Sequence, residues 1–289
     1  MRKDLILPGL ALGAGVLGFG LRRWQWASGY DPDTQLFASG HPAALLLLVL
    51  AAGLALAALF LLRGSKIPED APLPFRCPSP VYMSLMAASA LLLLGSGVLG
   101  LLYGMEELAL WRIDPESHLL TYPVSVMLCA LLAFAAGLSN LMLGKGAYRG
   151  NAPQVCSLLA LFPPMTALVW LFSTHLAHGT DPILMNYAFS LAAAIFLMLA
   201  HYDAAAAFHD RPHPFRGAFC ALLGIFFGLV SLADGLPPFQ AVLTAAFVLS
   251  ALAGLWSLLR TAFGPPWPKR LLEARMPLGA RDEEDDGPV

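Results

Sequence analysis

The sequence predicts an all-α fold, a polytopic bundle of about eight transmembrane helices built from helical hairpin repeats. Three observations support this prediction. The 289 residues are 58% hydrophobic and only 12% charged, with a mean hydropathy of +0.68, whereas soluble chains contain about 25% charged residues. Eight apolar runs are each long enough for a membrane span, which takes roughly 20 residues. A loop motif also recurs along the chain, with similar apolar runs on either side.

The first apolar run, Leu5 to Leu21, follows the basic residues Arg2 and Lys3. It could instead be a signal peptide, because Ala27-Ser28-Gly29 offers small residues for cleavage. We expect the helix to be retained, since the run is long for a signal peptide and Arg22-Arg23-Trp24 forms an interfacial stop. The other predicted spans are Ala43 to Leu62, Tyr82 to Gly104, Val124 to Leu143, Val155 to Ala177, Ile183 to His201, Gly217 to Ala233 and Phe239 to Ala262.

The distribution of basic residues predicts the orientation in the membrane. Fourteen of the 17 Lys and Arg residues fall at the amino terminus, after spans two, four and six, and around the end of the last span. The other loops hold only Arg22, Arg23 and Arg112. Since basic residues stay on the cytoplasmic side, both termini are predicted to be cytoplasmic. We expect a single transmembrane domain over residues 1–263 and a disordered cytoplasmic tail over residues 264–289.

The repeated motif is D-P-[DE]-[ST]-x-L, found at residues 31–36 and again at 114–119. Each copy follows a glycine-rich apolar run and precedes one rich in leucine and alanine. Fixed-period similarity of this kind predicts repeated structural units. We expect hairpin units over residues 1–66 and 80–146, followed by 153–216 and 217–263. Asp181-Pro182 and Asp234-Gly235-Leu236-Pro237 are looser echoes of the motif.

The predicted outer face is acidic, and its repeated loops form the first candidate site. If the loops converge, the acidic cluster would contain Asp31, Asp33, Asp114, Glu116 and His118. Such a cluster could bind a divalent or organic cation. Two simpler roles stay open: Asp followed by Pro is a favourable helix start, and three nearby arginines could neutralise the acids.

A second candidate site is a cavity near the middle of the membrane, lined by Pro163, Pro164, Thr166 and Asn186. The two prolines remove backbone donors from the fifth span and should kink or unwind it. Irregular backbone at this depth is tolerated only beside protein or a water-filled cavity. A kink filled by neighbouring side chains is the alternative. No Asp, Glu, Lys or Arg falls near the middle of any predicted span, which weakens a proton-coupled mechanism.

Three G-x-x-x-G pairs, Gly9/Gly13, Gly100/Gly104 and Gly224/Gly228, predict close helix packing. The partners that we expect are the lipid bilayer and a membrane-protein partner or a second copy of the chain through glycine faces. No nucleic-acid partner is expected.

No catalytic motif, cofactor or metal site is predicted. His201, Asp203, His209, Asp210 and His213 cluster after span six, but their spacing matches no standard metal site.

The segment Leu21-Arg22-Arg23-Trp24-Gln25, the Asp-Pro-Asp-Thr loop and His41-Pro42 resemble a group of bacterial polytopic membrane proteins of unassigned function. The resemblance covers about the first quarter of the chain. It implies a location in the bacterial inner membrane and does not indicate any chemical activity.

Two functions remain open from the sequence, with an integral membrane enzyme as a distant third. The first is a non-enzymatic scaffold, sensor or accessory subunit, and the second is a transporter or facilitator for a small solute through a cavity near the fifth span. Only the fifth span carries a pair of prolines, whereas paired breaks in corresponding spans are typical of transporters. The sequence therefore favours the first function.

Overall fold

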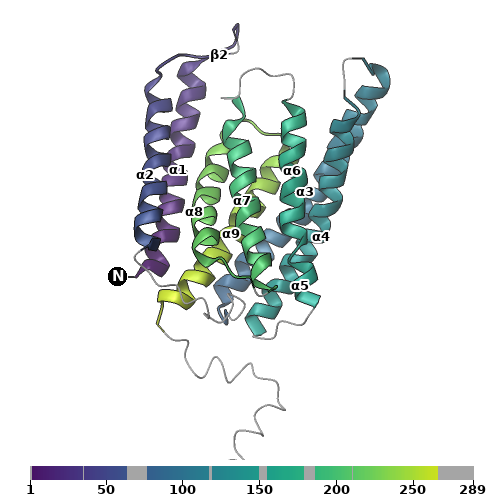
Figure 1. Ribbon diagram of the computed structural model, residues 1–289. Coiled ribbons are helices and arrows are strands. Elements are labelled where there is room, and N and C mark those ends of the chain that lie inside the picture. Colours follow the sequence, from purple (N-terminus) through teal and green to yellow (C-terminus); the bar gives the residue numbers. More distant parts are fainter. Residues whose placement is uncertain are drawn as a thin grey trace, which may run out of the picture.

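A computed structural model describes residues 2–34, 36–63, 77–116, 119–149, 155–178, 186–209 and 211–265. This part of the chain is almost entirely helical (Figure 1). Eight of its helical segments are long and apolar enough to cross a membrane. The predicted all-α class is confirmed, and the helices are consistent with a multi-pass membrane protein.

The helices agree with the predicted spans in number and order, and they differ at the ends. The fifth span is divided into two helices, α5 and α6, and a short antiparallel hairpin of β1 and β2 joins α1 to α2. In chain order the elements are α1 (Lys3–Gly29), β1 (Tyr30–Asp31), β2 (Leu36–Phe37), α2 (Pro42–Arg63), α3 (Pro80–Ile113), α4 (Thr121–Arg149), α5 (Val155–Leu159), α6 (Phe162–Ala177), α7 (Ala188–Ala207), α8 (Pro214–Ser231) and α9 (Pro238–Phe263).

Two helices continue well past the apolar runs that predicted them. Helix α1 extends through Arg22 to Gly29, and α3 has 34 residues and ends at Ile113. Hydropathy identifies only the stretch that suits lipid, whereas backbone hydrogen bonding continues until the chain turns. The predicted stop at Arg22-Arg23-Trp24 is therefore inside a helix.

The bundle has two distinct ends (Figure 1). The hairpin end carries β1 and β2, and the terminal end carries the start of α1 and the last turn of α9. This arrangement follows from the even number of spans. The cytoplasmic orientation of the termini stays a prediction.

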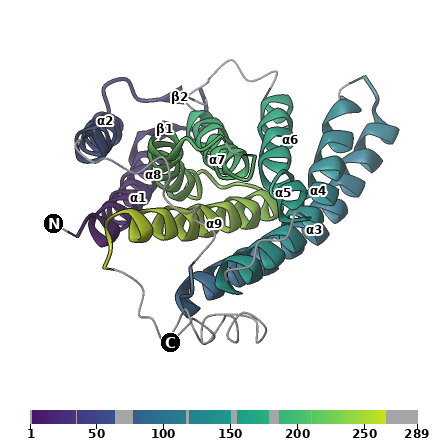
Figure 2. The ribbon, with the colours of Figure 1, turned by 60° about the horizontal axis from the view of Figure 1, so that its bottom comes forward.

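Helix α9 runs through the middle of the bundle (Figure 2) and contacts α1, α3, α7 and α8. Glycines permit the close approach of α8 to its neighbours. A Cβ atom at Gly228 would lie 2.5 Å from a methyl carbon of Val248 on α9, and one at Gly224 would lie 2.9 Å from Leu197 on α7. Small residues let helices pack closely in lipid, so this glycine pair has the packing role predicted for it.

The other two glycine pairs differ from each other. Gly100 and Gly104 face α4, where added Cβ atoms would meet Ala130 at 3.0 Å and Met127 at 2.6 Å. A Cβ atom at Gly9 or Gly13 would meet nothing within 4 Å.

Helix pairs α1–α2 and α3–α4 each form an antiparallel hairpin, on opposite sides of the bundle (Figures 1 and 2). Their structural equivalence as repeats stays a prediction.

Candidate functional site

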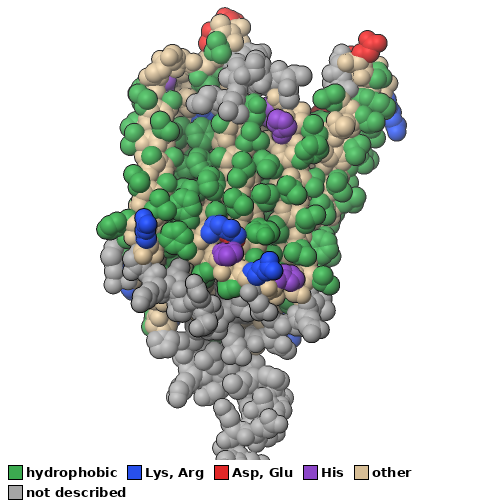
Figure 3. Space-filling view, in the orientation of Figure 1, with side chains coloured by type: hydrophobic (Ala, Val, Ile, Leu, Met, Phe, Trp, Pro, Cys, Tyr) green, Lys and Arg blue, Asp and Glu red, His purple; other side chains and the backbone are tan. Residues whose placement is uncertain are grey.

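The structure separates the residues of the predicted acidic cluster. Asp31 and Asp33 lie in the β1–β2 hairpin above α1 and α2, whereas Asp114 and Glu116 lie at the tip of the α3–α4 hairpin. Figure 3 shows these acidic side chains at two separate corners of the hairpin end. His118 lies outside the described residues. Within the described ranges, no group of three His, Cys, Asp or Glu side chains is placed to hold a metal ion.

Asp31 has a local structural role that differs from the predicted helix start. One carboxylate oxygen accepts a hydrogen bond from the hydroxyl of Thr34 at 2.7 Å, and the other accepts one from the backbone N–H of Asp33 at 3.1 Å. These bonds lower the pKa of Asp31, the Thr34 bond most. The carboxylate thus closes a tight turn between two strands. Asp114, in the second copy of the motif, ends α3 as its C-cap residue.

The four residues of the predicted midplane cavity are also divided. Pro163 and Pro164 are buried in the first turn of α6, where missing backbone donors cost little. The buried Thr166 hydroxyl lies 2.8 Å from the carbonyl oxygen of Phe162 and 3.1 Å from that of Leu132 on α4. Asn186 lies far from these residues, at the hairpin end just before α7. The break in span five is therefore a packed helix junction around Thr166.

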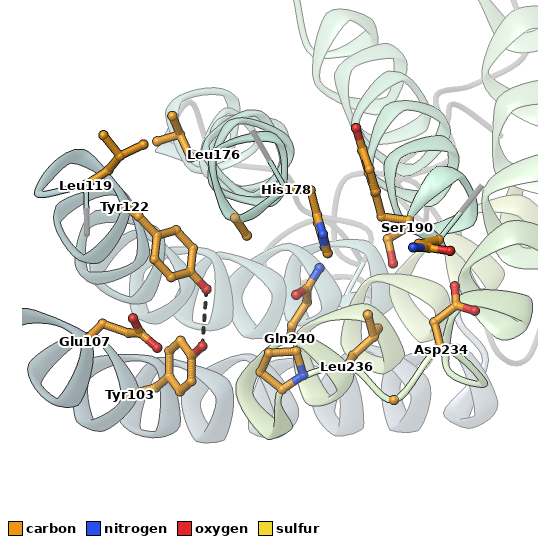
Figure 4. A pocket seen from close by; sticks show the side chains of 15 residues that line it. Tyr103, Glu107, Leu119, Tyr122, Leu176, His178, Ser190, Asp234, Leu236 and Gln240 are labelled. Carbon is orange, nitrogen blue, oxygen red and sulfur yellow. Dashed lines mark hydrogen bonds between the residues drawn. The ribbon is translucent and has the colours of Figure 1, made fainter. Parts of the chain in front are cut away.

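A polar pocket of about 440 Å³ lies at the hairpin end, between the ends of α3, α4, α6, α7 and the α8–α9 loop (Figure 4). Its volume is in the range of small-molecule sites. The described residues that line it are Tyr103, Glu107, Leu119, Tyr122, Leu176, Ala177, His178, Asn186, Tyr187, Ser190, Asp234, Gly235, Leu236, Pro237 and Gln240.

One wall of the pocket is aromatic and acidic, and it comes from α3 and α4. The hydroxyl groups of Tyr103 and Tyr122 lie 3.4 Å apart, and their rings meet edge to face. The carboxylate of Glu107 lies one helical turn after Tyr103 and interacts with its hydroxyl. The Tyr103 ring also packs on Phe239 of α9, with ring centroids 5.0 Å apart.

The centre of the pocket contains His178 and Gln240, which point toward each other in Figure 4. The imidazole of His178 stacks on the ring of Tyr187 at 4.4 Å, with the planes almost parallel. Gln240, near the start of α9, donates a hydrogen bond from its amide to the hydroxyl of Thr174 at 3.1 Å. This bond fixes the start of α9 against α6 and forms part of the pocket floor.

The opposite wall contains Asp234 and Ser190. The side chain of Asp234 is only 3% exposed, and Ser190 is 1% exposed. Oδ2 of Asp234 and the hydroxyl oxygen of Ser190 have no hydrogen-bond partner among the described residues. Unsatisfied buried polar atoms are rare in folded proteins, because each costs about 1–3 kcal/mol. Two at one pocket wall indicate a place for a polar ligand.

The other oxygen of Asp234 is fully engaged. Oδ1 accepts hydrogen bonds from Nε of Arg22 at 2.6 Å and from the indole N–H of Trp26 at 3.0 Å. Burial raises the pKa of the Asp234 carboxyl, and the charge of Arg22 opposes that rise. Asp234 is thus a buried carboxylate with one oxygen bound and the other without a hydrogen-bond partner among the described residues.

Arg22 itself is completely buried. Besides Asp234, it donates hydrogen bonds to the side chain of Gln25 at 2.9 Å and to the backbone carbonyl of Asn186 at 3.4 Å. Its guanidinium also lies over the rings of Trp26, Phe37 and Phe189, with distances of 4.8 to 5.4 Å to their centroids. Such contacts stabilise a desolvated cation.

The sequence predicted Arg22 as an interfacial stop and as a counterion for the acidic loops. The structure pairs it with Asp234, which lies 212 positions later in the chain. In the sequence, the two residues share only a predicted place in outer loops and opposite charges. No local pattern connects them.

At the terminal end, two of the predicted residues, His201 and Asp203, are held by other groups. The guanidinium of Arg216 binds the buried carboxylate of Asp203, with Nε 3.0 Å from both oxygens. His201 lies with Nδ1 2.7 Å from the carbonyl oxygen of Leu197 and Nε2 2.8 Å from the hydroxyl of Ser250. Asp210 lies outside the described residues. These contacts explain the buried groups as structural.

Comparison with protein-family models, curated proteins and solved structures gives no match to this chain.

Proposed function

We propose that this protein is a membrane-embedded sensor or accessory subunit that binds a small polar ligand in the hairpin-end pocket. The observation that carries the proposal is the pair of buried, unpartnered oxygens of Asp234 and Ser190 at the wall of a cavity of about 440 Å³. The pocket is at the hairpin end of the bundle, beside the loop between α8 and α9.

The alternative, a transporter with a cavity near the fifth span, has less support. The hydroxyl of Thr166 is bonded to backbone carbonyls, and the side chains around it are buried. Deeper than the pocket floor, Trp170 on α6 stacks on Phe247 of α9 with ring centroids 5.8 Å apart. The His201 ring then meets Phe247 edge to face. These side chains fill the interior between the pocket and the terminal end.

The location that fits this function is the bacterial inner membrane, with the pocket facing outward and the termini in the cytoplasm. The inference uses the excess of basic residues on the terminal side. A reporter active only in the cytoplasm should be active when fused after Val289 and inactive when inserted at Gly40, a turn residue with positive φ. The opposite pattern at both positions would reverse the orientation and place the pocket inside the cell.

Replacement of Ser190 by alanine tests the binding function directly. The variant should be about 1 kcal/mol more stable than the wild type without ligand, because it removes a buried hydroxyl that has no partner. Thermal unfolding of the purified protein should be measured with a panel of small amines, carboxylates, sugars and amides at millimolar concentration. At least one class should raise the wild-type melting temperature, and the increase should be smaller in Ser190→Ala.

A matched control is Ser96→Ala. Ser96 is also buried in a helix, but its hydroxyl donates to the carbonyl oxygen of Phe239 at 2.9 Å. Loss of that bond should destabilise the protein by about 1 kcal/mol and leave the ligand response unchanged. If no class of compound shifts the wild type, or if both variants respond equally, the pocket is not a binding site.

A further inference from the structure

The pocket is lined by two carboxylates, Glu107 on α3 and Asp234 in the α8–α9 loop. No Lys or Arg is found among the described lining residues. The buried Arg22 beside Asp234 directs its bonds to Oδ1, to Gln25 and to the carbonyl of Asn186. The charge of Arg22 balances that of Asp234, and the carboxylate of Glu107 is left uncompensated by the described lining residues. The electrostatic field of the pocket therefore favours a cation over an anion.

Of the two unpartnered oxygens, the carboxylate oxygen of Asp234 requires a donor, and the Ser190 hydroxyl can use one. Oδ2 of Asp234 accepts only, and the Ser190 hydroxyl can accept as well as donate. A primary ammonium group presents three N–H donors and a positive charge, so its chemistry matches a buried carboxylate oxygen beside a hydroxyl. A quaternary ammonium lacks N–H donors, and a metal ion would need more ligands than these two oxygens provide.

The rest of the pocket suits a partly apolar body. Leu119, Leu176 and Leu236 line it. Tyr103 and Tyr122 lie on one side of the pocket and His178 on the other (Figure 4). The ring of His178 stacks on that of Tyr187. Aromatic faces attract cations and pack well against flat or aliphatic groups.

From these features we infer that the ligand is a small primary amine, bound as its ammonium ion against Asp234 and Ser190, with its apolar body against the aromatic side chains of the pocket. This inference rests on the proposed binding function and names the chemical class of its ligand.

Three probes of similar shape test the inference: 2-phenylethylammonium, the neutral 2-phenylethanol and the anionic 3-phenylpropanoate. Calorimetry with the full-length purified protein should show at least tenfold tighter binding of the ammonium than of either other probe. Ser190→Ala should weaken ammonium binding at least fivefold, since a hydrogen bond to a charged group is lost. Glu107→Gln should weaken it by a smaller factor, and Ser96→Ala should leave it unchanged.

The results separate this inference from the proposed function. If the alcohol or the carboxylate binds as tightly as the ammonium, or if Ser190→Ala binds the ammonium like the wild type, the amine assignment is wrong. If all three probes fail while another class in the panel gives a shift that depends on Ser190, the assignment is wrong and the binding function stands. If no class of compound gives a shift that depends on Ser190, both the amine assignment and the proposed binding function are wrong.

Discussion

Replacement of Arg22 by alanine should lower the free energy of unfolding by about 3–5 kcal/mol, because it leaves the buried carboxylate of Asp234 without its counterion. Asp234→Ala should have a comparable effect, since it leaves a buried guanidinium without its acid and Trp26 without its acceptor. Both partners are almost fully buried, at 0% and 3% exposure, so solvent does not screen the loss. Chemical or thermal unfolding in a mild detergent would measure the change.

Arg23→Ala is the matched control, because this neighbour on the same helix is exposed. Its effect should be within about 0.5 kcal/mol. The double replacement Arg22→Met with Asp234→Leu should cost much less than the sum of the two alanine variants, since both charges are removed together. Equal effects of Arg22→Ala and Arg23→Ala, or strict additivity in the double variant, would show that the ion pair contributes little.

The ion pair also connects the fold to the pocket. It joins α1 to the loop before α9, and it binds Oδ1 of Asp234, a pocket-lining residue whose Oδ2 is left without a partner among the described residues. The first helix therefore supplies a residue that orients a pocket side chain although no residue of α1 lines the pocket. The function of the pocket and the packing of α1 should accordingly be lost together in Arg22→Ala.

The eight spans could be predicted because each is a local property of roughly 20 consecutive residues, and a long apolar run has few alternatives in a membrane. The ends were harder to predict. Helix α1 continues past Arg22 because that charge meets Asp234 inside the bundle, which hydropathy does not record. The same long-range pairing explains why the pocket was missed.

The two candidate sites predicted from the sequence depended on which distant segments come together in the fold. Local sequence patterns do not show that. The repeated loops looked equivalent, yet Asp31 closes a strand turn while Asp114 ends a helix. The prolines of span five marked a real interruption, at the junction of α5 and α6, but neighbouring side chains fill it. Asn186 was predicted to line the midplane cavity together with the prolines, but it lines the hairpin-end pocket instead.

The second large effect is expected at Trp170, the largest fully buried side chain of the described core. It lies one turn before Thr174, which bonds to Gln240 in the pocket, and it stacks on Phe247. Trp170→Ala should cost about 3–5 kcal/mol of stability through the cavity that it leaves. Trp170→Phe should cost much less, because the indole N–H has no hydrogen-bond partner among the described residues and its removal offsets part of the lost packing.

Unfolding measurements on both variants would test this packed layer beneath the pocket, with Trp24→Ala as the control at a tryptophan that is 45% exposed. The control should change stability by less than about 0.5 kcal/mol. Ligand binding should persist in Trp170→Phe, because the pocket floor formed by Gln240 and Thr174 is intact above the ring. A loss of binding without a loss of stability in Trp170→Phe would mean that the ligand site extends down into the bundle, as a transport pathway requires.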